Sequence, residues 1–336
     1  MSHVITLDQL KQTLGAKLAD GARVVAPVLR GELAFFQEVS DLEQASFAPR
    51  VRFQNSIKEF FFPRHETLFS FVRQGSDVQL TDAPDFDVEQ IVVGARPCDA
   101  ASLPILDPLF AWDYQDRFFQ QRRAKSTVVV FACKESDGHC FCSAMGGAPD
   151  NTAGADAIMF DLGDGSFEVR CVTDKGKALF TGKTTESDKV GKACDPPKVD
   201  FEIAPIANWV RNNFSSPAWE ELSLRCVGCG ACAFVCPTCH CFDIVDEGSY
   251  SKGKRVKNWD SCQTALFTLH ASGHNPRATQ GKRQRQRILH KFVIYPDKFG
   301  QNLCTGCGAC SRSCGVAFGV RPLLTALAQE VAKSEN

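Results

Sequence analysis

Eight cysteines near the C-terminus, arranged as two copies of one spacing, constrain this chain more than any other feature. The first copy is Cys226-x2-Cys229-x2-Cys232-x3-Cys236 and the second is Cys304-x2-Cys307-x2-Cys310-x3-Cys314. Bacterial ferredoxins hold cubane [4Fe-4S] clusters with this spacing, and its duplication makes a chance match remote. The spacing therefore predicts two [4Fe-4S] clusters and a protein that moves electrons.

Each run supplies three corners of one cube, so the fourth ligand must come from elsewhere. Glycines at 228, 230, 306 and 308 permit the φ > 0 turns of a tightly wrapped loop. In two-cluster ferredoxins the last Cys of each run binds the other cluster. We therefore expect one cluster on Cys226, Cys229, Cys232 and Cys314, and a second on Cys304, Cys307, Cys310 and Cys236. Pro237 gives the first run its usual C-P ending, whereas Gly315 replaces proline in the second.

A zinc-binding module is the alternative for these cysteines, because C-x2-C pairs also bind zinc through four sulfurs. Zinc motifs usually present two separated pairs, whereas here four cysteines fall within eleven residues. The chain has 17 cysteines in 336 residues, and a chain of this length buries a core without disulfides. The odd count favours ligands over disulfides, and thus a reduced, cytoplasmic setting.

Composition also limits the partners. No apolar run approaches the roughly 20 residues that span a bilayer, and the N-terminus lacks the pattern of a signal peptide. The formal net charge of -1 gives no support for nucleic-acid binding. We expect a cytoplasmic protein without a membrane span and without a nucleic-acid partner.

Apolar periodicity predicts an α+β protein. Helical patterns cover 5–20, 65–74 and 100–110, and strand patterns cover 24–29, 91–93, 128–132, 157–162 and 167–173. We expect an α/β domain over 1–205, the domain in which the candidate third cluster lies, a dicluster ferredoxin-like domain over 206–325 and a tail over 326–336. The ferredoxin-like domain contains a long insertion at 237–303, between the two cysteine runs.

The insertion and several upstream motifs carry a family resemblance. The insertion contains Cys236-Pro-Thr-Cys-His-Cys-Phe-Asp-Ile, Trp259…Cys262, His274-Asn-Pro-Arg277 and His290-Lys291-Phe292. Upstream lie Ser56-x-Lys58-x-x-Phe61-x-Pro63-x-x-Glu66-x-Leu68, Gly94-x-Arg96-Pro97-Cys98-Asp99, and Cys140-Phe141-Cys142 with Gly146-Gly147. Together they resemble the family of two-cluster iron–sulfur subunits that includes the beta subunit of soluble sulfhydrogenases and the iron–sulfur subunit of anaerobic sulfite reductase.

The resemblance implies a non-catalytic electron-transfer subunit of a multi-subunit oxidoreductase from an anaerobic setting. Its partners would be a flavoprotein subunit that oxidises NAD(P)H and a catalytic hydrogenase or sulfite/sulfur reductase subunit. The same relay in a heterodisulfide-reductase-like or other low-potential complex is the alternative. The chain has no G-x-G-x-x-G at a strand-to-helix junction, no P-loop and no nucleophile elbow, so we expect no catalytic residues of its own.

A third group of cysteines lies in the N-terminal part. Cys98 and Cys133 follow two predicted strands, and adjacent parallel strands end at one edge of a sheet. With Cys140 and Cys142 they make four thiolates, which together with the resemblance predicts a third [4Fe-4S] cluster; the alternative is that they are ordinary buried cysteines. Cys171 and Cys194 have no ligand-spaced companion and are interpreted as structural or incidental.

Two features of the insertion stay open. Cys239, Cys241 and Cys262 either pack beside a cluster and tune it, or bind a metal, with His240, His270 or His274 completing a zinc site. The first interpretation is favoured. The basic run at 282–291 predicts a helix with charge on many faces, which is either a solvated surface or a docking surface that also shields the charge of reduced clusters.

Overall fold

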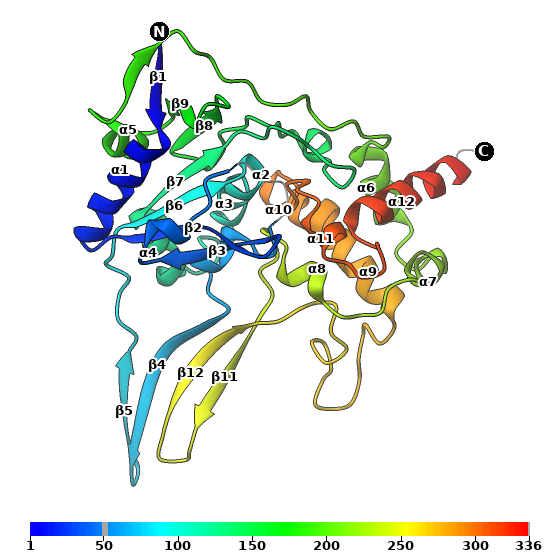
Figure 1. The fold of residues 1–336 in the computed structure, drawn as a ribbon. Helices are drawn as coiled ribbons and strands as arrows, with labels where there is room; N and C mark the ends of the chain where they lie inside the picture. The colour runs from blue at the N-terminus through cyan, green and yellow to red at the C-terminus, as the bar shows by residue number, and fades with distance from the viewer. Residues whose placement is uncertain (49–52, 335–336) are drawn as a thin grey trace.

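The N-terminal half is built on a mixed β-sheet (Figure 1). The computed structural model describes residues 1–48 and 53–334, and over these residues the sheet has the strand order β10-β1-β9-β8-β7-β6-β2-β3. The central pairs β2–β6, β6–β7 and β7–β8 are parallel, and the outer pairs are antiparallel. The strands are β1 (Ser2–Thr6), β2 (Arg23–Arg30), β3 (Leu33–Val39), β6 (Gln90–Ala95), β7 (Ser126–Phe131), β8 (Ala157–Asp161), β9 (Ser166–Cys171) and β10 (Thr185–Ser187).

Helices cover both faces of this sheet, which is why its central strands are continuous apolar runs. Leu103 of α3 and Phe119 of α4 pack in one core cluster with Val92, whereas Leu10 of α1 packs with Ile91 in the other. The helices of this half are α1 (Leu7–Ala19), α2 (Pro97–Ala100), α3 (Ser102–Leu106), α4 (Arg117–Lys125) and α5 (Asp174–Phe180). With the sheets, they confirm the predicted α+β class.

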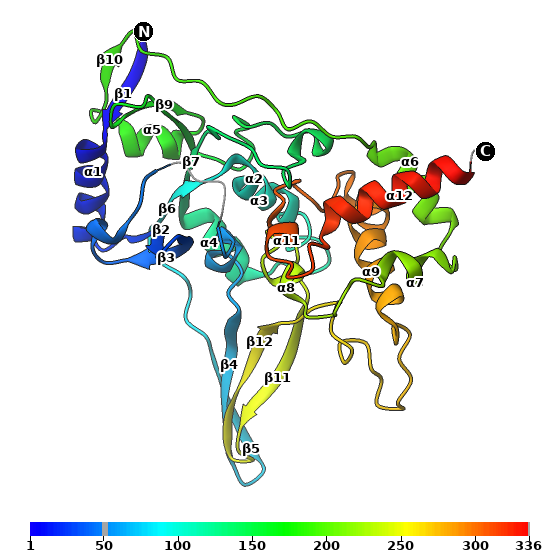
Figure 2. The same ribbon diagram turned by 45° about the vertical axis from the view of Figure 1, so that its right-hand side comes forward.

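A second sheet projects from this body as an arm, as both views show (Figures 1 and 2). It has the strand order β11-β12-β4-β5, and all its pairs are antiparallel. Its strands are β4 (His65–Gln74), β5 (Asp77–Asp82), β11 (Phe242–Gly248) and β12 (Lys252–Trp259). The insertion thus supplies half of a sheet whose other half lies before residue 100, and the arm links residues on both sides of the boundary expected near 205.

The helix expected at 65–74 is wrong, because these residues form strand β4. Residues from Ser70 to Gln74 alternate between half-buried and exposed positions, which is the period of a strand. The strand pairs on one side with the adjacent β5, but its other partner, β12, lies far away in the chain, so no local pattern indicates that second pairing.

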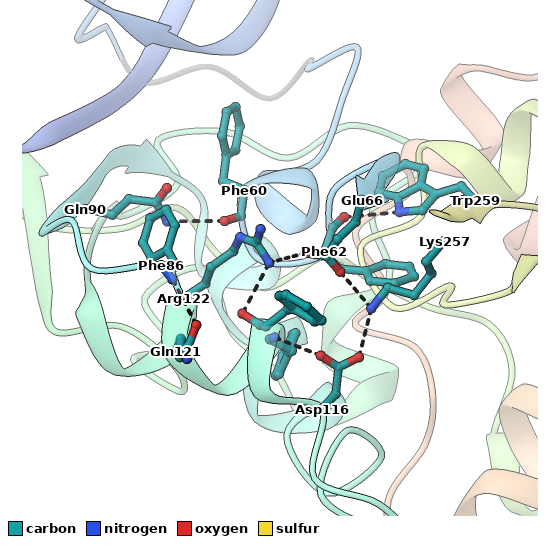
Figure 3. A network of polar contacts seen from close by, with 12 residues as sticks. Phe60, Phe62, Glu66, Phe86, Gln90, Asp116, Gln121, Arg122, Lys257 and Trp259 are labelled. Carbon is teal, nitrogen blue, oxygen red and sulfur yellow. Dashed lines mark hydrogen bonds and ion pairs between the residues drawn. The ribbon is translucent and has the colours of Figure 1, made fainter. Parts of the chain in front are cut away.

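A buried ion network fastens the arm to the body (Figure 3). Glu66 of β4 lies opposite Lys257 of β12, and their charged atoms are 2.8 Å apart. Arg122 of α4 reaches the other carboxylate oxygen of Glu66 at 2.5 Å, and Asp116 binds Lys257 at 2.8 Å. Glu66 and Lys257 are 6% and 3% exposed, so their charges depend on this network, in which Arg122 also pairs with Glu66 and Asp116 also pairs with Lys257. Glu66 therefore has a structural role.

The C-terminal half is a group of helices packed around the two cysteine runs. Its core contains Trp209, Trp219, Phe292 and Leu324. The helices are α6 (Ile203–Asn212), α7 (Ala218–Ser223), α8 (Ala231–Phe234), α9 (Gln280–Leu289), a π-helical turn (His290–Ile294), α10 (Tyr295–Phe299), α11 (Ala309–Arg312) and α12 (Val320–Ser334). The expected tail is largely part of α12, and its last two residues, 335–336, lie outside the described residues. No helix in the described ranges has the length and apolarity to cross a membrane.

Candidate iron–sulfur centres

The two cysteine runs surround two cavities, and each run contributes to both. One cavity, with an empty volume of about 360 Å³, is lined by Cys226, Cys229, Cys232 and Cys314. The other, with an empty volume of about 280 Å³, is lined by Cys236, Cys304, Cys307 and Cys310. We name them the first and the second cavity. Each cavity is thus walled by the first three cysteines of one run and the last cysteine of the other.

Glycines shape the loops that carry these thiols. Gly230 and Gly308 have φ of 76° and 73°, and each directly precedes a short helix, α8 or α11. A side chain at Gly306 would meet the backbone of Phe141 at 2.5 Å, and one at Gly308 would meet the carbonyl of His139 at 2.6 Å. Glycine is therefore required in the second loop for its conformation and for close packing against residues 139–141.

Buried cations surround the thiols of the second cavity. The Lys291 ammonium lies 3.4 Å from the Cys236 sulfur and donates to the Leu303 carbonyl at 2.8 Å. Arg287 donates to the Cys232 carbonyl at 2.9 Å and lies 3.7 Å from the Cys239 sulfur. Burial alone would lower the pKa of Lys291. The negative charges of Cys236 and Cys239 together have a larger effect in the opposite direction, so the pKa of Lys291 is raised. The basic run is therefore not simply a solvated helix, because Arg287 and Lys291 face the cysteines.

Amide donors point to the first cavity. Gln280 and Gln284 of α9 place their Nε2 atoms 3.2 Å and 3.0 Å from the Cys226 sulfur. Gln284 is 4% exposed, and it lines the first cavity. Hydrogen bonds to cluster sulfurs raise reduction potentials by stabilising the more negative state. Helix α9 and the π-helical turn that continues it thus serve both cavities, with Gln280 and Gln284 at one and Arg287 and Lys291 at the other.

The residues at both cavities fit a cubane cluster. Burial raises the pKa of Cys304 to about 11 and that of Cys232 to about 11. Such thiols ionise readily only beside a strong positive charge, and a coordinated metal supplies one. All 17 cysteines are free thiols. No group of three or more His, Cys, Asp or Glu side chains in the described ranges is placed to hold a single metal ion. A cubane instead takes each thiolate on a different iron atom.

Three further cysteines form a buried group beside these cavities. Cys239 donates to Cys236, and this hydrogen bond lowers the pKa of Cys236 and raises that of Cys239. Cys241 bonds to Cys262 and lowers the pKa of Cys262 to about 6. Lys58 donates to the Cys239 carbonyl at 2.7 Å, and burial lowers the pKa of Lys58 to about 8. His240 packs against His290 with ring centroids 5.3 Å apart. The hydrogen bond from Cys239 to Cys236 thus supports a role for this group in tuning a centre at the second cavity.

The N-terminal thiols lie at the edge of the main sheet, next to the second cavity. Cys98 and Cys133 follow the adjacent parallel strands β6 and β7, as expected. Phe141, between Cys140 and Cys142, lines the second cavity, and its N–H donates to the Gly306 carbonyl at 2.8 Å. Cys98 lies beside Arg96, Asp99, Cys307 and Cys133. Cys171 is exposed at the end of β9.

The structure places Cys194, which the sequence analysis interprets as structural or incidental, beside Cys133. Its N–H donates to the carbonyl of Cys133 at 2.8 Å, so the two backbones are in direct contact. It lies in the long segment after β10, which has no regular structure before α6. No spacing pattern includes Cys194, and only the path of this segment back to β7 brings it to the other thiols.

Comparison with known proteins agrees with the site. Residues 225–318 match the family model described as a 4Fe-4S dicluster domain. Over 314 residues the chain is 29% identical to sulfhydrogenase 2 subunit beta of Pyrococcus furiosus, covering 89% of this chain and 90% of the relative. No solved structure matches the chain. The resemblance predicted from the motifs is confirmed: this chain carries a 4Fe-4S dicluster domain and resembles the beta subunit of a sulfhydrogenase along almost its whole length.

Proposed function

We propose that this chain is the electron-transfer subunit of a cytoplasmic oxidoreductase complex. It would relay electrons between a flavoprotein that oxidises or forms NAD(P)H and a catalytic hydrogenase or sulfite/sulfur reductase subunit. The observation that carries the proposal is the pair of cavities, each lined by four thiols contributed by both cysteine runs. A relay without catalysis of its own agrees with the lack of nucleotide-binding motifs in the sequence.

Two [4Fe-4S] clusters, when bound, would supply one-electron redox centres. Cys226, Cys229, Cys232 and Cys314 would hold one, and Cys304, Cys307, Cys310 and Cys236 the other. The chain's own residues set the surroundings of these centres. Phe141 and Val320 line the second cavity as apolar walls, and Lys291 and Arg287 oppose the negative charge that reduction adds.

Two features support work within a complex. The Pyrococcus relative is named as a subunit, and the similarity covers 89% of this chain. Beside the arm, an open apolar pocket is lined by residues from α4, β4, β11 and the turn before α4, including Trp112, Tyr114 and Phe242. These three side chains are exposed in the isolated chain. Exposed apolar surface of this kind is typical of sites that bind another protein or a ligand.

Anaerobic affinity purification of the tagged full chain from its own cells tests the proposal. We expect co-purified flavin together with nickel or sirohaem, since these mark the flavoprotein and the hydrogenase or sulfite reductase subunit. Nickel would favour the hydrogenase route and sirohaem the reductase route. A heterodisulfide-reductase-like complex would co-purify with neither nickel nor sirohaem. A chain that purifies alone with its iron would contradict the complex, and a chain without iron would contradict the relay itself.

A further inference from the structure

We propose that Cys133, Cys140, Cys142 and Cys194 hold a third iron–sulfur cluster, at the edge of the main sheet beside the second cavity. The proposal rests on the relay function only for its choice of an iron–sulfur cluster over another metal. It replaces Cys98, which the sequence pattern favours, with Cys194, which has no pattern at all.

Backbone contacts bring the four cysteines to one place. Cys194 donates to the Cys133 carbonyl at 2.8 Å. The hydroxyl of Ser143, the residue after Cys142, donates to the Pro197 carbonyl at 2.6 Å. The segment that carries Cys194 is thus fixed both to the end of β7 and to the turn that carries Cys142. Cys140 and Cys142 are two residues apart, on either side of buried Phe141.

The same four thiols are close enough to one another for their charges to interact. Cys133 lies within electrostatic range of Cys194, Cys142 and Cys140. Cys142 lies within range of Cys140 and Cys194, and Cys194 lies within range of Cys140. All six pairs among the four thiols therefore interact. A cluster's positive iron would relieve this mutual repulsion, because each thiolate would bind metal.

Cys98 occupies a different position. Burial raises its pKa, Arg96 lowers it, and the thiolates that act on it are Cys307 and Cys133. Cys307 lines the second cavity, so Cys98 lies near a wall of that cavity as well as near Cys133. Arg96, itself 5% exposed, lies near Cys98, Cys307 and Cys133. Arg96 thus places a buried positive charge near both groups of thiols, where it would stabilise electrons on either centre.

The proposed site is more open than the second cavity. Its four cysteines are all half-buried, whereas Cys236, Cys307 and Cys310 are buried. The loop that carries Cys140 and Cys142 packs on the second run through the hydrogen bond from Phe141 to Gly306. Arg312 holds the same contact by pairing with Asp137 at 3.2 Å and binding the Cys307 carbonyl. A cluster here would therefore lie between the second cavity and the surface, at a point where a partner could exchange electrons.

Metal analysis of the anaerobically purified full chain, with matched cysteine variants, tests the proposal. The wild-type chain should contain about 12 iron atoms, four for each cubane. C194S and C142S should each lower this to about 8, whereas C98S and C171S should retain about 12. About 8 iron atoms in the wild-type chain would overturn the third cluster and leave the two-cluster relay standing. If C98S lost as much iron as C194S, the choice of Cys194 over Cys98 would be wrong. If the wild-type chain held zinc at this site instead of iron, the iron–sulfur assignment would be wrong.

Alkylation of the wild-type holoprotein tests the same assignment without any substitution that could affect folding. Cys194 should resist iodoacetamide in the holoprotein and react after the iron is chelated, whereas exposed Cys171 should react in both states. Peptide mass spectrometry reads each thiol separately. Modification of Cys194 in a holoprotein that keeps all its iron would overturn its role as a ligand.

Discussion

The Lys291 ammonium lies 3.4 Å from the sulfur of Cys236, at the wall of the second cavity. Lys291 is 2% exposed, so solvent screens this contact little. A buried positive charge favours the state with more negative charge. Lys291 should therefore raise the reduction potential of the centre that Cys236 helps to hold.

Removing this charge should move one potential and leave the other nearly unchanged. A hydrogen bond to a charged group contributes about 1.5–3 kcal/mol, which corresponds to about 60–130 mV for one electron. We expect K291M to lower the potential of the centre at the second cavity by that amount in an EPR-monitored redox titration. K282M, on α9 just before the turn that carries Lys291 and away from this contact, is the control. Equal potentials in K291M and K282M would contradict the role of Lys291.

Gln284 should act on the other centre. Its Nε2 lies 3.0 Å from the sulfur of Cys226, and the amide donor carries no charge, so its contribution is smaller than that of Lys291. We expect Q284L to lower the potential of the centre at the first cavity by about 20–60 mV. Q286L on the same helix is the matched control. A shift of the second centre in Q284L, with the first unchanged, would refute the assignment of α9 to two cavities.

The arm should depend on Glu66. Replacing one member of a buried ion pair leaves the other charge uncompensated, which costs about 3–5 kcal/mol. We expect E66A to lose about 3 kcal/mol of stability in urea unfolding, because Arg122 and buried Lys257 would both lose this carboxylate and only Asp116 would still pair with Lys257. D246A removes an exposed pair with Arg255 on the same sheet and should leave the urea midpoint nearly unchanged. Similar losses in the two variants would contradict the buried network.

His290 should make the chain sensitive to acid. Burial lowers its pKa to about 4, from an ordinary value of 6.5. Between these values the unfolded chain binds a proton that the folded chain does not, so stability falls as the pH drops through this window. From pH 7 to pH 5 the loss is about 2 kcal/mol. H290Q should flatten the pH dependence of the anaerobic urea midpoint by about this amount, whereas H3Q, at an exposed site, should not.

The local features of the clusters could be predicted from the sequence because they are encoded within short runs. Gly230 and Gly308 occur where the chain turns into α8 and α11, and the cysteine spacing indicates the crossed arrangement that the cavities display. The buried strands β6 and β7 were also predictable, since helices cover both faces and leave an uninterrupted apolar run.

What could not be predicted depends on contacts between distant segments. Strand β4 was predicted as a helix, and its pairing with β12 of the insertion joins segments far apart in the chain. Arg287 and Lys291 resemble a solvated basic face in the sequence, and only the packing of α9 against the cysteine runs buries them. Cys194 reaches Cys133 through a long irregular segment, for which no periodicity exists.

The crossing of ligands between the two runs is the central claim, and EPR of single cysteine variants tests it most directly. C314S should lose or alter the same signal as C226S, although Cys314 belongs to the second run. C236S should likewise match C307S. We predict these matching EPR changes in anaerobically purified protein reduced with dithionite. If C314S instead affects the signal that C307S affects, each run holds its own centre and the account is wrong.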